Sequence, residues 1–248
     1  MPNKVAVVTG GSRGIGRAIV LTLARAGYQI AFSYVRDEVA AMTLRDEVQA
    51  SGIECLALQC DVSSGDSIKA FFERVEAHFQ RIDLLVNNAG ISPKGPNGAR
   101  LNTLETDLRT WGQVFHVNFF SSVILARGLM QELAAAKGSV VNVTSIAGSR
   151  VHPFAGAAYS TSKAALAALT REMAHDFGPH GVRVNAIAPG EIETSILSAG
   201  TELIVDQQIP MHRLGKPEEV ASLVHFLCTR GASYINGSEI HVNGGQHV

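Results

Sequence analysis

The chain has 248 residues, a formal net charge of −1 at pH 7 and a hydrophobic share of 46%. That length fits one α/β domain, and the hydrophobic share is enough for a large core. The near-neutral charge and the pI of about 6.8 exclude the chain-wide basic surface that proteins binding nucleic acid or membrane surfaces carry.

The sequence predicts a cytoplasmic protein that holds no metal. The first strand-like run begins at residue 4, so no signal peptide is expected, and no apolar run reaches the length of a membrane span. Cys55, Cys60 and Cys228 are odd in number and lack metal-site spacing, so we expect buried free thiols. Cys55 and Cys60 lie five apart on one predicted strand and should point to opposite faces.

Apolar strand-like runs alternate with helical patterns along the chain. The runs predict strands at 4–9, 28–34, 54–60, 83–87, 139–144, 182–187 and 239–242. The segments between them predict helices at 15–26, 38–50, 65–79, 107–136, 157–177 and 217–228. This alternation predicts an α/β fold, a Rossmann-type doubly wound parallel sheet in a single domain over residues 1–248. Ligands of such sheets bind at the carboxyl ends of the strands.

The first predicted strand ends in a glycine-rich turn, GGSRGIG at residues 10–16, which leads into the first predicted helix. Strand, glycine turn and helix in this order form a binding site for a dinucleotide pyrophosphate. Gly10, Gly14 and Gly16 would let the backbone approach the phosphates, and the free N–H groups and dipole of the helix start would stabilise the anion. A glycine turn alone also occurs without a ligand; the flanking strand and helix favour the binding site.

The second predicted strand, 28–34, has no acidic residue at its end. In NAD enzymes of this architecture a carboxylate there binds the ribose 2′-hydroxyl, but Tyr34 holds that position and the next carboxylate is Asp37. Arg13 and Arg36 would instead pair with a 2′-phosphate through charge-assisted hydrogen bonds. We therefore expect a preference for NADP(H), with NAD(H) as the alternative; an ordinary solvated arginine is the alternative for Arg36.

Tyr159 and Lys163 lie four residues apart in the helix predicted at 157–177 and therefore share one of its faces. A phenol has a pKa of about 10, and an ammonium held close to it favours the phenolate and would lower that pKa. A hydroxyl from another element, such as Ser145, would hold a substrate oxygen beside the phenol. The same spacing occurs on many solvated helix faces, so the argument for a proton shuttle depends on the glycine turn.

Further motifs follow in chain order: Asp61-Val62, NNAG at 87–90, Asn118, Ser145, YSTSK at 159–163 and Pro189-Gly190. Together with TGGSRGIG at 9–16, they resemble the short-chain dehydrogenase/reductase family from about residue 4 to the C-terminus. The resemblance implies a NAD(P)-binding Rossmann fold and an enzyme that transfers a hydride between nicotinamide and a ketone or secondary alcohol.

The resemblance also implies a catalytic tetrad of Asn118, Ser145, Tyr159 and Lys163. Tyr159 would act as general acid in reduction and as base in oxidation, while Ser145 binds the substrate oxygen. Lys163 would lower the Tyr159 pKa and reach the nicotinamide ribose. Asn118, expected inside the helix 107–136, would hold a water that links the lysine to solvent. A strand-ending serine and a surface amide are the alternatives for Ser145 and Asn118.

For the cofactor, the resemblance places the Asp61 carboxylate on the adenine amino group and the NNAG backbone beside the adenosine ribose. The segment from Pro189 to Thr194 would pack on the nicotinamide and bind its carboxamide. The cofactor-binding residues expected are Gly10, Ser12, Arg13, Gly14, Ile15, Gly16, Tyr34, Arg36, Asp61, Val62, Asn88, Ala89, Gly90, Tyr159, Lys163, Pro189, Gly190, Ile192 and Thr194.

Within the family the nearest resemblance is to the 3-oxoacyl-(acyl-carrier-protein) reductases of fatty acid synthesis, carried by IPMHRLGKPEEVA at 209–221 and HVNGG at 241–245. Those enzymes dock an acidic carrier protein on a Lys/Arg-rich run and a further arginine. Here the run is AAAK at 134–137, and His180 replaces the arginine. An acidic partner would lose most of its electrostatic steering on such a surface.

The residue after Pro189-Gly190 is usually apolar or aromatic in relatives, and here it is Glu191. This departure predicts that Arg150, His152 and Glu191, together with Ser145, contact the substrate. The residues that would line a polar pocket, each also explicable as a surface residue, are Arg150, His152, Glu191, His212 and Arg213. We therefore expect a small or medium polar carbonyl compound or alcohol. A carrier-protein reductase is the alternative, and the intact tetrad disfavours a non-catalytic cofactor-sensing protein.

Two segments border the expected crevice. Residues 91–102 predict a loop, and residues 191–216 correspond to the family's substrate lid, although a surface excursion would look the same. The resemblance implies a homotetramer built through the helices 107–136 and 157–177 and the C-terminal strand. Close intrachain packing is the alternative explanation for the small residues at 164–168.

Overall fold

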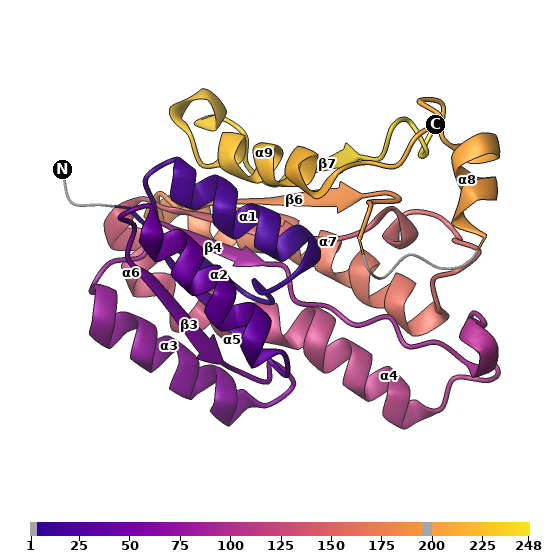
Figure 1. Cartoon of the computed structure of the whole chain (residues 1–248), viewed down its shortest axis with the longest axis horizontal. Coiled ribbons are helices and arrows are strands. Elements are labelled where there is room, and N and C mark those ends of the chain that lie inside the picture. Colours follow the sequence, from indigo (N-terminus) through magenta and orange to yellow (C-terminus); the bar gives the residue numbers. More distant parts are fainter. Residues whose placement is uncertain (1–3, 195–199) are drawn as a thin grey trace.

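The computed structural model describes residues 4–194 and 200–248 and contains a seven-stranded sheet with helices on both faces (Figure 1). The strand order is β3-β2-β1-β4-β5-β6-β7, and every neighbouring pair is parallel. The order reverses between β1 and β4, and at such a switch point a crevice opens beyond the carboxyl ends of the strands. This is the predicted Rossmann-type α/β fold. The strands are β1 (Val5–Val8), β2 (Gln29–Tyr34), β3 (Cys55–Gln59), β4 (Leu84–Asn87), β5 (Ser139–Val143), β6 (Arg183–Pro189) and β7 (Glu239–Val242).

Two hydrophobic cores lie on opposite faces of the sheet. Ala6 and Val8 belong to the core under α1, α2 and α9, whereas Val7 belongs to the core under α3, α5, α6 and α7. The alternation of side chains along a strand explains this division, and burial on both faces explains why β1 is apolar throughout. The helices are α1 (Gly14–Arg25), α2 (Glu38–Ala50), α3 (Gly65–Phe79), α4 (Leu108–Phe115), α5 (Ser121–Gly128), α6 (Met130–Ala136), α7 (Ala157–Phe177), α8 (Thr201–Gln208) and α9 (Pro217–Leu227).

The predicted strands and helices are confirmed to within two residues at each end, with the exception of the long helix at 107–136. That prediction was wrong. After α4 the chain forms a π-helical turn, His116–Phe120, before α5, and a second break at Leu129 separates α5 from α6. A π-helical turn is uncommon and is often found at functional sites. Here it contains Asn118, whose buried amide bonds the backbone of another segment and compensates for the irregular helix.

The cysteines follow the prediction for two of the three. Cys55 and Cys60 are buried free thiols, and they belong to the two opposite cores. Burial raises the pKa of Cys55 to about 12, so this thiol stays protonated at neutral pH. Cys228 is free and partly exposed. Among residues 4–194 and 200–248, no helix has the length and apolar character needed to cross a membrane.

Candidate active site

The glycine turn after β1 has a backbone that only glycine accommodates well. Gly10 and Gly14 have φ angles of +64° and +52°, in the left-handed region. A side chain at Gly16 would place its Cβ 2.1 Å from the carbonyl oxygen of Gly10, so the turn and the first turn of α1 are in close contact. Arg13 caps α1 without a side-chain hydrogen bond, which leaves the first N–H groups of the helix available to an anion.

Side chains from the neighbouring strands hold this turn in place. The Asn88 Nδ2 donates to the carbonyl oxygens of Thr9 at 3.0 Å and Gly10 at 3.1 Å. The Thr9 Oγ1 accepts from the backbone N–H groups of Asn88 and Ala89, both at 3.0 Å, and the buried Ser33 Oγ accepts from the Gly10 N–H at 3.1 Å. Sequence reasoning gave no role to the hydroxyls of Thr9 and Ser33. The signal that could have identified them is a hydroxyl residue in or next to an otherwise apolar strand.

The ends of β2 and β3 lie side by side, because Tyr34 pairs with Gln59 in the sheet. Tyr34 is buried in the core, and Arg36 is exposed. The Asp61 carboxylate accepts hydrogen bonds from the Ser63 N–H at 2.9 Å and Oγ at 2.7 Å. These bonds, with the nearby charge of Arg36, lower the pKa of Asp61. Arg36 and Asp61 thus stand close together at the edge where the adenosine half of a dinucleotide is expected.

Tyr159 and Lys163 lie on α7 beside the carboxyl end of β5. The Lys163 side chain is 3% exposed, and its Nζ donates to the Val143 carbonyl oxygen at 2.6 Å and lies 5.9 Å from the centroid of the Tyr159 ring. Burial lowers the pKa of Lys163 to about 8. A hydrogen bond joins Tyr159 to Ser145, which follows β5 at the start of a short helical turn.

The pKa of Tyr159 moves in the direction opposite to the one expected from sequence. Burial raises the pKa, and the negative charge of Glu191 raises it further, while the hydrogen bond with Ser145 opposes them. Burial dominates because transferring a phenolate out of water costs more than one hydrogen bond returns. The phenol is therefore held protonated, in the form that can donate a proton.

Asn118 is buried to 1% exposure and is not a surface amide. Its Oδ1 accepts from the Ile91 N–H at 2.8 Å, and its Nδ2 donates to the Ile91 carbonyl oxygen and the Ser162 Oγ, both at 3.0 Å. A Cβ built on Gly90 would lie 3.4 Å from the Lys163 Nζ and 3.5 Å from the Asn118 Oδ1. The end of the NNAG motif therefore passes between the lysine and the asparagine, and sequence reasoning did not anticipate the role of Ile91.

The segment after β6 extends from the sheet toward the glycine turn. A Cβ on Gly190 would meet the Asn243 Cβ at 2.6 Å and the Gln246 Oε1 at 2.7 Å, so this glycine permits close packing of the C-terminal segment. Ile192 is buried and bridges to Gly215. A Cβ on Gly14 would lie 3.5 Å from the Thr194 Cγ2, which places Thr194 next to the glycine turn. Of the expected lid, residues 191–194, α8 and the segment up to 216 are described, and 195–199 lie outside the described residues.

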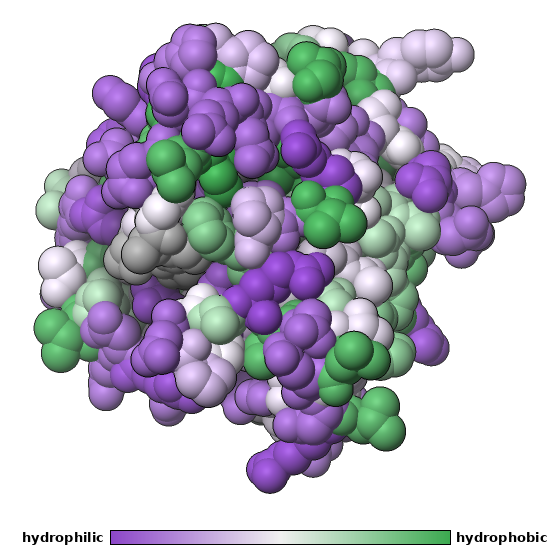
Figure 2. All heavy atoms as spheres, turned by 90° about the vertical axis from the view of Figure 1, so that its right-hand side faces the viewer, coloured by the Kyte–Doolittle hydropathy of each residue, from purple (hydrophilic) through white to green (hydrophobic). Residues whose placement is uncertain are grey.

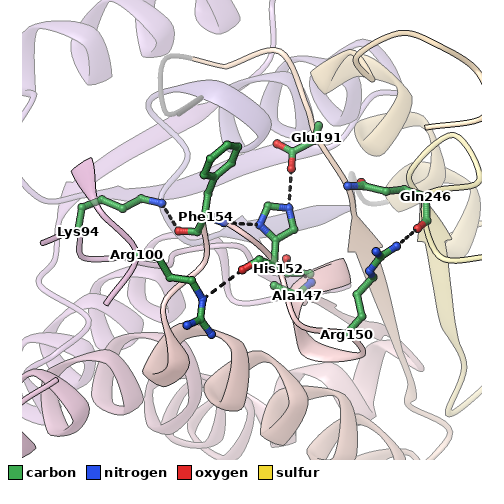
Figure 3. Close-up of polar contacts among 9 residues, drawn as sticks. Lys94, Arg100, Ala147, Arg150, His152, Phe154, Glu191 and Gln246 are labelled. Carbon is green, nitrogen blue, oxygen red and sulfur yellow. Dashed lines mark hydrogen bonds and ion pairs between the residues drawn. The ribbon is translucent and has the colours of Figure 1, made fainter. Parts of the chain in front are cut away.

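Four charged or polar side chains gather beside this segment (Figure 3). The His152 Nε2 lies 2.6 Å from the Glu191 Oε1, and both side chains are largely buried. Lys94, from the loop after β4, donates to the carbonyl oxygen of Phe154, and Arg100 donates to the carbonyl oxygen of His152 at 3.2 Å. The structure brings together His152 and Glu191, two of the residues predicted to line a polar pocket, and places Lys94 and Arg100 beside them, which sequence reasoning missed.

Other residues expected in the polar pocket are engaged elsewhere. Arg150 is exposed and donates through Nη1 to the carbonyl oxygen of Gln246, so it ties the C-terminal segment to the loop after β5 (Figure 3). Arg213 forms a salt bridge with Glu219 at the start of α9, 2.7 Å between Nη2 and Oε1. His212 is exposed.

Figure 2 faces the side to which β6 points in Figure 1, and there hydrophilic side chains are interspersed with smaller hydrophobic groups.

The sequence and the fold of this chain have close counterparts among known proteins. A protein-family model described as enoyl-(acyl-carrier-protein) reductase matches residues 10–247. Protein FixR of Bradyrhizobium diazoefficiens is 49% identical over 247 residues, which cover 99% of this chain and 87% of that protein. The 3-oxoacyl-(acyl-carrier-protein) reductase FabG of Staphylococcus epidermidis is 37% identical over 250 residues, which cover 99% of this chain and 100% of that protein.

Solved structures agree over nearly the whole chain. A short-chain dehydrogenase from Burkholderia cenocepacia in complex with NADP has a TM-score of 0.92 at 30% identity, covering 99% of this chain and 98% of that one. A 3-oxoacyl-(acyl-carrier-protein) reductase from Brucella melitensis with bound NAD has a TM-score of 0.91 at 30% identity, covering 99% and 91%. With whole-length matches in family, sequence and structure, this chain belongs to the short-chain dehydrogenase/reductase family.

Proposed function

We propose that this protein is an NADP(H)-dependent oxidoreductase that transfers a hydride between nicotinamide and a ketone or secondary alcohol, with Tyr159 as general acid and base. The observation that carries the proposal is the position of Tyr159: its ring centroid lies 5.9 Å from the Lys163 Nζ, beside Ser145, at the strand edge that the glycine turn shares. The related FabG of S. epidermidis is named as a reductase of a 3-oxoacyl group, which is a ketone.

The residues present fit a dinucleotide. Gly10 and Gly14 give the turn its left-handed backbone, Gly16 lets it pack against the start of α1, and the uncapped start of α1 offers N–H groups to a pyrophosphate. Gly90 leaves room next to Lys163, where the nicotinamide ribose would bind. When bound, the nicotinamide supplies or accepts the hydride.

The preference for NADP(H) is supported by charge. Arg13 and Arg36 are both exposed, and among the described residues neither forms a salt bridge with a carboxylate. Tyr34 replaces the carboxylate that would repel a 2′-phosphate. A 2′-phosphate at the ends of β2 and β3 would therefore meet the exposed Arg36, whose charge also acts on Asp61, and Arg13 provides a second exposed guanidinium in the glycine turn. The relatives themselves include one structure with NADP and one with NAD.

In ketone reduction the chain supplies the proton and the alignment. Ser145 donates a hydrogen bond to the substrate oxygen and fixes it beside the phenol. Tyr159, held protonated by burial, gives its proton to the oxygen as the carbonyl carbon becomes an alcohol carbon. The Lys163 ammonium then stabilises the tyrosinate. Proton return through a water beside Asn118 completes the proposal, and the reverse sequence oxidises an alcohol.

For the substrate we propose a small or medium polar carbonyl compound that contacts Ser145, His152 and Glu191. The near-whole-length similarity to FabG favours a second candidate, reduction of a 3-oxoacyl carrier-protein thioester. Against it, the run 134–137 provides one cation, Lys137, at the end of α6, and His180 provides none when neutral. We also propose that the protein is a cytoplasmic homotetramer; light scattering at the mass of a monomer would contradict the tetramer.

A single panel tests the function and separates the two substrates. The purified protein is assayed by loss of reduced-nicotinamide absorbance with acetoacetyl-CoA and with a series of small ketones, using NADPH and then NADH. The proposal expects turnover of polar ketones with NADPH and a lower kcat/KM for the thioester. A higher kcat/KM for the thioester would favour the carrier-protein reductase, and absence of turnover with every ketone and thioester would contradict the proposed function.

A further inference from the structure

The Glu191 carboxylate lies just beyond the carboxyl end of β6 and is fixed there. The Glu191 side chain is 12% exposed, and its Oε1 accepts a hydrogen bond of 2.6 Å from the His152 Nε2. The direction of this bond follows from the other ring nitrogen. The His152 Nδ1 accepts from the Phe154 N–H at 3.2 Å, so in a neutral ring the proton is on Nε2 and points at Glu191.

The loop that carries His152 is held on both sides. Lys94 donates to the carbonyl oxygen of Phe154, and the Arg100 Nε donates to the carbonyl oxygens of His152 at 3.2 Å and Ala155 at 2.9 Å. Figure 3 shows these side chains converging on the loop from the opposite side to Glu191. The His152–Glu191 pair is therefore a rigid part of the pocket, as a specificity element requires.

The second oxygen of this carboxylate is available to a ligand. Among the described residues, Glu191 Oε2 has no hydrogen-bond partner, whereas Oε1 is occupied by His152. The carboxylate lies close enough to Tyr159 for its charge to act on the phenol, and it acts on the Lys94 ammonium in the same way. Glu191 directly follows Pro189-Gly190 at the carboxyl end of β6, the sheet edge at which Tyr159 and Lys163 lie beside β5.

The charges around Glu191 determine which substituent of a substrate can bind beside this carboxylate. An alkyl chain placed against a largely buried carboxylate would remove its remaining water and offer no hydrogen bond in return. A carboxylate or phosphate on the substrate would be repelled by Glu191, and an ammonium would compete with the Lys94 ammonium, which already interacts with that carboxylate. A neutral hydroxyl avoids each of these costs and donates a charge-assisted hydrogen bond to Oε2.

We propose, building on the proposed carbonyl reduction, that Glu191 is a specificity-determining residue that selects ketones bearing a neutral hydroxyl group near the carbonyl. The substrate class is then a hydroxyketone, or a diol in the oxidative direction. Glu191 acts by binding the hydroxyl and takes no part in the transfer of hydride or proton.

The experiment compares three ketones of one carbon skeleton: 2-butanone, 3-hydroxy-2-butanone and 4-hydroxy-2-butanone, each with NADPH. The protein is expected to prefer at least one hydroxyketone over 2-butanone by about 10- to 100-fold in kcat/KM, the range that one hydrogen bond to a buried charge provides. Glu191→Leu should abolish that preference, because it should lower kcat/KM for the preferred hydroxyketone by a larger factor than kcat/KM for 2-butanone. Glu191→Gln, which keeps an acceptor for His152, should retain part of the preference.

The controls separate binding of the hydroxyl from damage to the fold. Glu193→Leu removes an exposed carboxylate two residues away and should leave the preference unchanged. NADPH binding, followed by fluorescence, should be the same in all variants. Equal kcat/KM for the three ketones in the unmodified protein, or an unchanged preference in Glu191→Leu, would overturn this inference while leaving ketone reduction intact. If the unmodified protein turned over none of the ketones, that result would instead contradict the proposed function on which this inference rests.

Discussion

The Lys163 ammonium hydrogen-bonds the backbone of Val143 and lies 5.9 Å from the centroid of the Tyr159 ring. The lysine is thus anchored to the end of β5, the same strand end that presents Ser145 to the phenol. The proposed proton donor Tyr159, the proposed substrate-binding Ser145 and the Lys163 ammonium therefore all lie at the carboxyl end of β5.

Replacement of Tyr159 by phenylalanine should remove the proton donor and little else. The expected loss in kcat for ketone reduction is about 100- to 10,000-fold, the usual contribution of a positioned general acid. NADPH binding should be retained, because the ring that packs beside Lys163 is still present. Steady-state kinetics and fluorescence titration measure the two. Tyr234→Phe, at an exposed tyrosine, is the matched control and should behave like the unmodified protein; near-full turnover in Tyr159→Phe would contradict the mechanism.

The activity should fall as the pH rises past about 8, because Lys163 loses its proton there and the stabilising ammonium disappears. A lowered pKa means that the charged form is complete only below that value, so reduction is fastest on the acidic side. Tyr159, with its raised pKa, remains protonated across this range. The profile of kcat/KM for NADPH reports the free enzyme and should show the inflection. In Lys163→Met the inflection should vanish along with most activity; an unchanged inflection would assign it to another group.

The choice of cofactor should depend on Arg36. Replacing it with leucine should lower kcat/KM for NADPH by about 10- to 100-fold, the effect of one charge-assisted hydrogen bond to phosphate, and leave kcat/KM for NADH nearly unchanged. Arg25→Leu, at the exposed end of α1, is the control. A ratio of kcat/KM for NADPH over NADH below one in the unmodified protein would show that the NADP(H) preference is wrong.

Substitution of Gly16 by alanine should impair both folding and cofactor binding. The added Cβ would lie 2.1 Å from the Gly10 carbonyl oxygen, so the glycine turn would have to move away from α1. The thermal midpoint should fall, and the Kd for NADPH should rise at temperatures where the variant is folded. Gly65→Ala is the control, since nothing lies within 4 Å of its added Cβ. Equal midpoints and Kd values for Gly16→Ala and Gly65→Ala would contradict this reading of the turn.

Local sequence patterns predicted most of the fold, because the strands, helices and glycine turn depend mainly on residues that are close together in the chain. Burial of β1 on both faces appears as an unbroken apolar run, and the positive φ angles of Gly10 and Gly14 appear as glycines. The features that were missed depend on contacts between distant segments. The π-helical turn is compensated by the contact of Asn118 with Ile91, which helical periodicity alone does not reveal.

The direction of the pKa shift of Tyr159 could also not be predicted from the sequence. Spacing placed Lys163 near Tyr159 and predicted a lowered phenol pKa, but burial and the charge of Glu191 raise it. The charge of Glu191 acts across a large sequence separation, and the extent of burial is a property of the folded protein. Glu191 was noticed because a carboxylate is unusual after Pro189-Gly190, but its pairing with His152 was not predicted, and Lys94 in a glycine- and proline-rich loop gave no signal.

The π-helical turn at His116–Phe120 makes the length of this segment as restrictive as its composition. Each residue of a helix rotates the next by roughly 100°, so removing one residue from the turn would convert it to ordinary helix and swing the Asn118 amide away from Ile91. Neither side chain would have changed, yet their contact would be lost. The geometry of the candidate site therefore depends on the number of residues between α4 and α5 as well as on their identity. No point substitution changes that number.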